Sequence, residues 1–295
     1  MKNENIWHAN LLELIRRTSS DLPVDVEAAL KRARLREKRD SAAYRAIDII
    51  LQNIKLARIR RAPLCQDTGN LLFYICAPKG FDIAPLHLAI YSAVREATHE
   101  GILRQNTIDS LTSNTCSMNI GKGMPVIHID YARRKTIDIR LILKGGGCEN
   151  VSAQYSLPDM ALHAGRDIDG VRRCILNAVL RAQGNGCPPA VLGVCIGGDR
   201  ATGADFAKRQ LLRKIDDSAP ERKLAQLEKR TLREANAFYI GPMGFGGATT
   251  LLAVKIAALS RLPASYFVSV SYMCWAFRRR GMILQPDGHV NRRLY

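Results

Sequence analysis

The sequence predicts a mixed α/β fold with a helical N-terminal portion, and three observations support this prediction. Apolar residues recur at helical spacing over residues 5–61. The segments 70–78 (NLLFYICAP) and 251–258 (LLAVKIAA) are short apolar runs of the kind that form strands. Helix-like and strand-like segments then alternate, with no internal repeat and no low-complexity linker.

The elements can be assigned in chain order. The helical portion has a break at Asp21–Pro23, and Ser41 is a candidate start for its last helix. Further helices are predicted at 86–101, 160–184, 201–214 and 220–237. Further strands are predicted at 189–198 and 265–273, together with a pair, 125–130 and 136–143, that is joined by the polar turn YARRK.

Length, composition and charge limit the function classes. The 295 residues suffice for one large domain or two smaller ones, and 47% of them are hydrophobic. No run approaches the roughly 18 apolar residues of a membrane helix, and the N-terminus does not resemble a secretion signal, so we expect a cytoplasmic protein. A net charge of +17 is compatible with binding to nucleic acid, to an acidic surface or partner, or to a small anionic substrate. The basic run 31–40 is most simply a solvated helix face.

The cysteines and the glycine-rich loops are the candidate functional features. The eight cysteines, none of them in a C-x-x-C pair, are Cys65, Cys76, Cys116, Cys148, Cys174, Cys187, Cys195 and Cys274. In a long chain this is no disulfide framework, which leaves buried thiols or metal ligands. Five glycine- or proline-bearing loops stand at 64–70, 143–150, 184–189, 193–199 and 240–247. None is a standard phosphate motif, and five together favour a shared binding site.

The spacing of the cysteines leaves their role open. Zinc ligands are usually paired at short spacing, whereas Cys65, Cys187 and Cys274 lie far apart. Three distant loops can converge on a four-iron cluster and leave one iron open as a Lewis acid. Buried thiols remain the simpler reading of spacing alone.

The order of the motifs, however, resembles one family. They are PLCQDTGN (63–70), NT-x₃-N-x-GKGMPVIHID (114–130), KGGGCENVS (144–152), GCPPAVLGVCIGG (186–198), LLRKIDD (211–217), IGPMGFGGATT (240–250), VKI (254–256) and CWAFRRRG (274–281). In this order they resemble the α subunit, or N-terminal lobe, of class I fumarases and L(+)-tartrate dehydratases. The resemblance runs from about Pro63 to Arg280.

The resemblance implies a [4Fe–4S] cluster held by Cys65, Cys187 and Cys274. Cys148 is a serine in many fumarase relatives, and it is interpreted with the remaining cysteines as a core or loop thiol. The implied organisation is a helical portion (1–62), a mixed α+β cluster-binding domain (63–281) and a C-terminal tail (282–295), or else one continuous domain.

The resemblance also implies roles in a hydro-lyase reaction. Gln66 and Asp67 are expected in the catalytic pocket, with a turn-stabilising aspartate as the alternative for Asp67. Arg104 is expected to clamp a substrate carboxylate, with a surface arginine as the alternative. Gly147 is expected to contact substrate through its backbone, and it is otherwise a turn glycine.

Some residues near these motifs stay undecided, and some depart from the family pattern. The side chains of Arg278–Arg280 could balance the cluster's charge, line an anionic interface or form a solvated face, and His128 is most simply a packed or surface residue. Cys116, Asp199 and Ala248 stand where many relatives have glycine, threonine and lysine, respectively. These departures leave the exact substrate open.

The resemblance implies a separate partner. The second lobe of the family, which carries further substrate-binding residues, would be a β subunit, in an α2β2 or similar assembly. The favoured reaction is hydration of fumarate to (S)-malate, and dehydration of L(+)-tartrate is the alternative. A non-catalytic basic nucleic-acid-binding or scaffolding relative is a further alternative. The low aromatic content, 6%, counts against a nucleic-acid-binding protein, and the intact cysteines count against a scaffold.

Overall fold

The computed structural model describes residues 2–295, and side chains from residue 6 onward. The chain forms two compact units. The first unit comprises the residues up to Val24, Gln52–Gly146 and Arg278–Tyr295, and the second comprises Asp25–Leu51 and Gly147–Phe277. Each unit contains its own sheet. The domain boundaries predicted at residues 62 and 281 stay a prediction.

The N-terminal portion is helical, as predicted. It consists of α1 (Lys2–Ser20), α2 (Val24–Arg36) and α3 (Ala42–Arg60). The chain leaves helical structure at 21–23, where proline cannot continue a hydrogen-bonded turn. The Ser41 hydroxyl accepts a hydrogen bond from the backbone N–H of Tyr44 at 3.1 Å, which is the expected capping contact at the start of α3.

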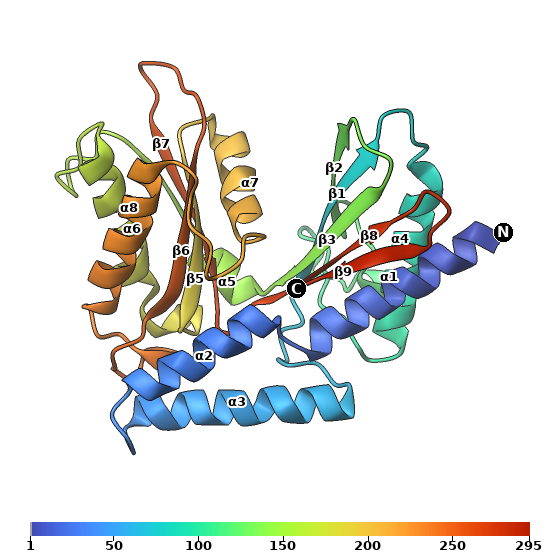
Figure 1. Ribbon diagram of the computed structural model, residues 1–295, viewed down its shortest axis with the longest axis horizontal. Helices are drawn as coiled ribbons and strands as arrows, with labels where there is room; N and C mark the ends of the chain where they lie inside the picture. Colours follow the sequence, from blue (N-terminus) through green and yellow to red (C-terminus); the bar gives the residue numbers. More distant parts are fainter. Residues whose placement is uncertain (1) are drawn as a thin grey trace. The chain divides into compact units, whose positions relative to one another are not determined.

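The first unit is a five-stranded sheet with helices on one face. The strand order is β2-β1-β3-β8-β9. The strands are β1 (Asn70–Pro78), β2 (Val126–Ala132), β3 (Ile137–Lys144), β8 (Arg278–Leu284) and β9 (Val290–Leu294). Helices α1 and α4 (Ala84–His99) contribute their apolar stripes to the core on one face of this sheet (Figure 1). The short 3₁₀ helix η1 (Ser117–Asn119) lies in the connection between α4 and β2.

The predicted pairing of 125–130 with 136–143 is wrong. Strands β2 and β3 both exist, but each pairs with β1, parallel and antiparallel, respectively. The side chains from Leu71 to Ile75 of β1 are all buried, so both faces of the strand are covered, as is usual for a strand in the centre of a sheet. Its central position determines where the flanking loops lie: β1 begins at the same end of the sheet at which β3 ends.

The second unit is a four-stranded sheet covered on both faces. The strand order is β4-β7-β5-β6, with β4 (Ala153–Ser156), β5 (Ala190–Ile196), β6 (Leu251–Ala258) and β7 (Phe267–Met273). In Figure 1, α6 (Ile168–Ala182) and α8 (Arg222–Asn236) lie on one side of the sheet and α7 (Arg200–Gln210) on the other. The unit also contains most of α2, the first half of α3 and three short helices, of which the first begins at the boundary between the units: α5 (Gly146–Asn150), η2 (Gln183–Gly186) and η3 (Pro242–Gly244).

Helix α6 is shorter than the predicted 160–184. The Asp167 side chain accepts a hydrogen bond from Gly170 N–H at 2.7 Å and caps the helix before Ile168. Residues 160–163 form turns instead, and Ala164 forms an isolated bridge with Asp159. An N-terminal cap of this kind satisfies a backbone donor that the helix itself leaves unpaired, so it sets the starting residue.

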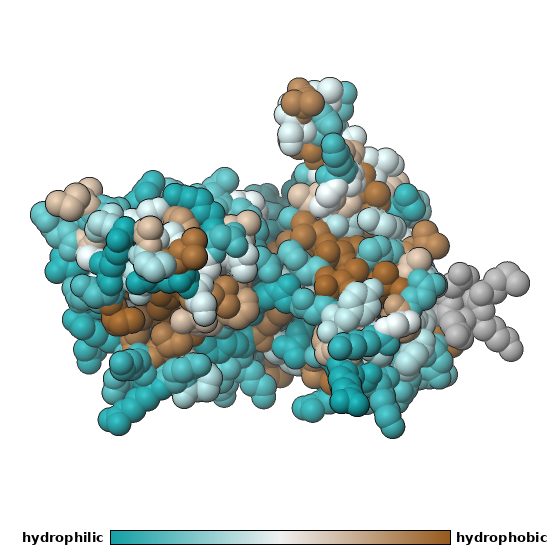
Figure 2. Space-filling view, turned by 90° about the horizontal axis from the view of Figure 1, so that it is seen from above, coloured by the Kyte–Doolittle hydropathy of each residue, from teal (hydrophilic) through white to brown (hydrophobic). Residues whose placement is uncertain are grey.

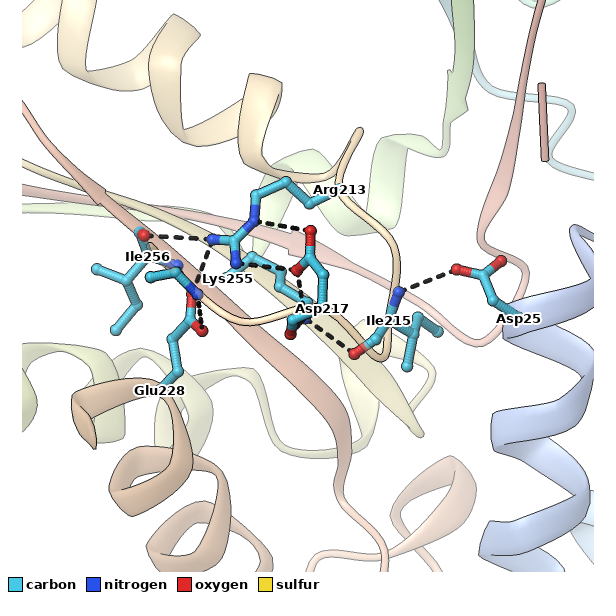
Figure 3. Close-up of polar contacts among 8 residues, drawn as sticks. Asp25, Arg213, Ile215, Asp217, Glu228, Lys255 and Ile256 are labelled. Carbon is cyan, nitrogen blue, oxygen red and sulfur yellow. Dashed lines mark hydrogen bonds and ion pairs between the residues drawn. The ribbon is translucent and has the colours of Figure 1, made fainter. Parts of the chain in front are cut away.

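A buried charged network explains two of the motifs, LLRKIDD and VKI (Figure 3). Lys255 of β6 donates to the carbonyls of Ile215 and Asp217 and to the Asp217 carboxylate, at 2.6–3.0 Å. Glu228 of α8 accepts from Arg213 and from the backbone N–H of Ile256. The network ties the loop after α7 to the sheet, which indicates a structural role for both motifs.

Over the described residues, no helix is both long enough and apolar enough to cross a membrane. The face shown in Figure 2 is largely hydrophilic, with apolar residues gathered in a few patches. Most of the large apolar side chains lie in the two cores instead.

Candidate functional site

The carboxylate of Asp67 ties two motif loops of the first unit together. Its Oδ1 accepts a hydrogen bond from Gly69 N–H at 3.0 Å, within the CQDTG loop. Its Oδ2 accepts from Gly146 N–H at 2.8 Å, in the KGGG loop that follows β3. This is the turn-stabilising arrangement that the sequence offered as the alternative to a catalytic role. A catalytic role for Asp67 stays a prediction.

Glycine is required where the two loops meet. Gly69 has φ +81°, and a Cβ there would lie 2.8 Å from the backbone of Lys144. A Cβ on Gly145 would lie 2.7 Å from Asp67 Oδ2. Both distances are shorter than real Cβ contacts, so side chains at these positions would push the loops apart.

Two buried polar side chains fix the segment that carries Arg104. The Thr68 hydroxyl, 1% exposed, accepts from the Arg104 backbone N–H at 3.1 Å and from the Asn106 side chain at 2.9 Å. Asn119, 3% exposed, donates to the Arg104 carbonyl at 2.7 Å and accepts from the N–H groups of Asn106 and Thr107. The backbone at Arg104 is therefore held beside the CQDTG loop.

The side chains of that region differ in exposure. Cys65 and Asp67 are half-buried, whereas Gln66 and Arg104 are exposed to solvent. An anchored backbone with an exposed guanidinium is suitable for binding a carboxylate. The sequence reasoning missed the positioning roles of Thr68 and Asn119. Their signal was present, because each is a small polar residue inside a glycine-rich motif.

A second group of loops meets in the second unit. Trp275 N–H donates to the Cys187 carbonyl at 3.1 Å, so the GCPP and CWA segments lie side by side. The backbone N–H of Cys274 donates to Cys148 Sγ at 3.3 Å. The predicted ligands Cys187 and Cys274 are half-buried cysteines in this group that form no disulfide, while Cys148 is buried.

Tyr272 lies next to this thiol group. Burial raises the pKa of Tyr272 above its usual range, and the neighbouring sulfurs of Cys148, Cys274 and Cys187 raise it further. A Cβ on Gly186 would lie 2.3 Å from the tyrosine ring. Glycine before Cys187 thus lets the GCPP loop lie directly on Tyr272. Cys187 itself adopts the left-handed conformation, with φ 50°.

The five glycine- or proline-bearing loops were predicted to form one shared site. This prediction is wrong for the loop 193–199. The IGPMGFGG loop does join the group, because Met243 N–H donates to the Pro188 carbonyl at 2.8 Å. The loop 193–199, in contrast, ends β5, whereas the GCPP loop begins it. A strand of seven residues separates the two by about 20 Å. At that end Asp199 caps α7.

The other two buried thiols in strands and helices are suited to the core. Burial raises the pKa of Cys174 to about 12, and it raises the pKa of Cys195 to about 12 as well. Metal ligation needs the thiolate, which these environments disfavour. Both residues are 0% exposed and pack within the second unit, which agrees with the prediction that they are core thiols.

Gly147 borders an open pocket of about 530 Å³ in the second unit. The polar residues of its lining are Asn150, Ser152, Gln154, Arg181 and Asn185. A Cβ on Gly147 would meet only the Asn185 carbonyl, at 3.8 Å, which is an ordinary contact. Nothing in the described chain therefore demands glycine at this position.

The three predicted ligands are divided between the units. Cys65 belongs to the first unit, and Cys187 and Cys274 belong to the second. Among the described residues, no group of three or more His, Cys, Asp or Glu side chains is close enough to hold a single metal ion. The three-cysteine set stays a prediction.

The three arginines after Cys274 are not a solvated face. Arg278, Arg279 and Arg280 of β8 are 1%, 0% and 5% exposed. Arg280 donates to the Asp21 carboxylate at 2.7 Å, and Arg279 lies 4.7 Å from the centre of the Tyr295 ring. The solvated alternative is therefore wrong.

Comparison with known proteins identifies the family. The sequence profile of the family described as fumarate hydratase (Fumerase) matches residues 8–283. The chain belongs to this family. The resemblance drawn from the motifs is confirmed, and so is the mixed α/β fold.

Three relatives show the range of names within the family. A Geobacillus stearothermophilus protein, provisionally named fumarate hydratase class I, is 46% identical over 98% of this chain. A Methanocaldococcus jannaschii protein, provisionally named L(+)-tartrate dehydratase subunit alpha, is 34% identical over 91%. The L(+)-tartrate dehydratase subunit alpha of Escherichia coli K12 is 29% identical over 91%. The chain spans 57% of the Geobacillus relative's length but 94% and 88% of the other two.

The donor chemistry of the candidate residues fits an iron–sulfur cluster. Cys65, Cys187 and Cys274 are half-buried cysteines that form no disulfide, and Cys65 and Cys187 lie in glycine-bearing loops, an environment expected of ligands that must reach a bulky group. A cluster bonds each thiolate through a different iron, so its ligands need not converge on one point as those of a single ion do. A buried guanidinium, that of Arg278, also has unpartnered donors, as would be expected near an anionic group.

Proposed function

We propose that the chain is the cluster-carrying α subunit of a hydro-lyase that interconverts fumarate and (S)-malate. Cys65, Cys187 and Cys274 would hold a [4Fe–4S] cluster, whose open iron supplies Lewis acidity toward the substrate hydroxyl and carboxylate. Family membership supports the hydro-lyase class. The 46% identity to the relative named for fumarate hydratase is the observation that favours fumarate.

The residues of the CQDTG region have assigned roles in this proposal. Arg104, with its backbone fixed by Thr68 and Asn119, binds a substrate carboxylate in bidentate fashion. Gln66 is exposed beside Cys65 and orients the substrate, and Asp67 holds or orients the group that moves the proton next to the carboxylate. Gly147 N–H is a donor for charge that develops on substrate oxygen.

A β subunit would complete the enzyme. The names of the Methanocaldococcus and Escherichia relatives, both alpha subunits, support this part of the proposal. We expect an α2β2 or similar assembly in which the partner contributes further cationic residues and the proton-transfer group. In the cell we expect the enzyme in the cytoplasm.

L(+)-tartrate dehydration is the second candidate. The observation that favours it is the identity of 34% and 29% to two relatives named L(+)-tartrate dehydratase subunit alpha. The two candidates differ only in the substrate, so one assay with both substrates separates them.

Anaerobic reconstitution tests the proposal. The chain should take up about four iron and four sulfide and develop a broad visible absorption. With the β partner added, fumarate hydration should be measured beside tartrate dehydration. A chain that binds no iron and sulfide would refute the cluster, and activity on tartrate alone would replace fumarate as the substrate.

A further inference from the structure

Arg278 is a fully buried cation whose donors lack partners. It is 1% exposed, and its Nε and Nη1 atoms have no hydrogen-bond partner within the part of the chain that the structure describes. A buried charge without a partner is strongly unfavourable, and native proteins retain one where a ligand or another group compensates it. The position therefore indicates an anion.

The sheet register places this cation close to the start of β1. Arg278 pairs with Leu143 of β3, and Leu143 pairs with Leu71 of β1. Directly opposed residues point to the same face, so Arg278 shares the face covered by α1 and α4. It also marks the end of the sheet at which the CQDTG loop, with Cys65, leads into β1.

The carboxylate of Asp21, which lies beside the next arginine on this face, is already occupied. Arg280, two residues along the same face, donates to Asp21 Oδ2 at 2.7 Å. Arg58 donates to Asp21 Oδ1, also at 2.7 Å. Both oxygens of Asp21 thus serve other arginines, which leaves the charge of Arg278 to be met by a group other than this carboxylate.

We propose that the Arg278 guanidinium is the counter-charge of the resident cluster, donating its two unpartnered N–H groups to sulfur acceptors of the group that Cys65 binds. This inference rests on the proposed cluster. A four-iron cluster held by three thiolates is anionic, and hydrogen bonds to its sulfurs tune its potential. The burial of Arg278 suits a permanent ligand, because a substrate must exchange at each turnover.

The test compares Arg278→Met, which removes the charge, with Arg278→Lys, which keeps it. The control is Arg279→Met, which removes the neighbouring buried arginine from the opposite face. In the cluster-free chain, Arg278→Met should leave the thermal midpoint unchanged or raise it, because it removes an uncompensated charge. A clear fall would show a partner within the protein and overturn the proposal.

The reconstituted chain supplies a second readout. The reduction potential of the cluster should fall in Arg278→Met and recover in Arg278→Lys, while Arg279→Met stays close to the unaltered chain. Equal potentials in all four proteins would overturn the proposal. If sodium fumarate stabilises the cluster-free chain only when Arg278 is present, the anion is a dicarboxylate and the cluster assignment of Arg278 is wrong.

The two levels of inference fail differently. Absence of iron and sulfide from the unaltered chain would refute the proposed function, and the role of Arg278 with it. The role of Arg278 alone would be refuted if the cluster content is normal and depends on the three cysteines, but the reduction potential does not change in the Arg278 variants.

Discussion

The Asp67 carboxylate accepts the backbone N–H of Gly146 at 2.8 Å, joining two motifs that lie 79 positions apart in the chain. The contact exists because β1 and β3 are antiparallel neighbours, so the loop before one meets the loop after the other. Together with the bond from Gly69, it leaves both carboxylate oxygens engaged. Whatever Asp67 contributes to chemistry, it also determines where the KGGG loop lies.

Replacing Asp67 by asparagine should destabilise the chain by about 1–3 kcal/mol, because an NH₂ group would then face a backbone donor. Urea unfolding of the cluster-free chain measures this, and cleavage by protease near residue 146 should increase. The neighbouring Gln66→Ala is the matched control, since Gln66 is exposed and should change stability by no more than about 0.5 kcal/mol. Equal stability of both variants would contradict the role of the Asp67 carboxylate in holding the two loops together.

Gly147→Ala should leave the fold intact and weaken substrate binding. The added Cβ would be 3.8 Å from the Asn185 carbonyl, so the free energy of unfolding should change by less than about 1 kcal/mol. If substrate approaches this backbone closely, KM rises with the β partner present. Gly145→Ala is the contrast, because its Cβ would clash with Asp67 at 2.7 Å and lower stability first. An unchanged KM in Gly147→Ala would remove Gly147 from the substrate site.

Local patterns predicted several elements well. Strands β1 (70–78) and β6 (251–258) match the predicted ranges to the residue, because each is an apolar run between residues that end a strand. Strand β8 was missed, since three consecutive arginines resemble a solvated segment. Their burial depends on partners such as Asp21 and on distant strand pairing, which no local window contains.

The site was predictable only in part for the same reason. The motifs could be recognised from their order along the chain. The residues that each motif contacts are determined by the tertiary structure. The pairing of Trp275 with Cys187 and the support of Arg104 by Asn119 are long-range contacts. Asn119 could have been suspected from its place in N-x-GKGMP, but its partners could not.

The ligand assignment predicts a contrast between two cysteines of one motif. Cys187→Ser should lower the iron and sulfide content of the reconstituted chain well below that of the unaltered chain. Cys195→Ser should leave the content unchanged, because Cys195 is 0% exposed and lies at the far end of β5. Iron analysis with visible spectroscopy measures both. Unchanged content in Cys187→Ser would eliminate the ligand assignment.

The buried thiol of Cys195 predicts a loss of stability at alkaline pH. Its pKa is raised from 9.0 to about 12, so the folded state keeps a proton that the unfolded chain releases. The stabilisation is full below pH 9 and is lost as pH rises toward 12. Between pH values of about 8 and 10.5, Cys195→Ala should lose about 2 kcal/mol less stability than the unaltered chain. Identical pH profiles in urea unfolding would contradict this.

The Glu228 network predicts a large structural effect without a functional one. Glu228 is 5% exposed and accepts from Arg213, Ala219 N–H and Ile256 N–H at 2.7–3.0 Å. Its removal leaves the buried N–H groups of Ala219 and Ile256 without this acceptor, while Arg213 keeps Asp217 as a partner. Glu228→Ala should therefore lower the free energy of unfolding in urea by about 2–5 kcal/mol. The exposed Glu221, in the loop just before α8, is the control, and its alanine variant should stay within about 0.5 kcal/mol. Below the unfolding transition, Glu228→Ala should still bind the cluster at the normal content. Loss of iron with unchanged stability would instead place this network in the active site.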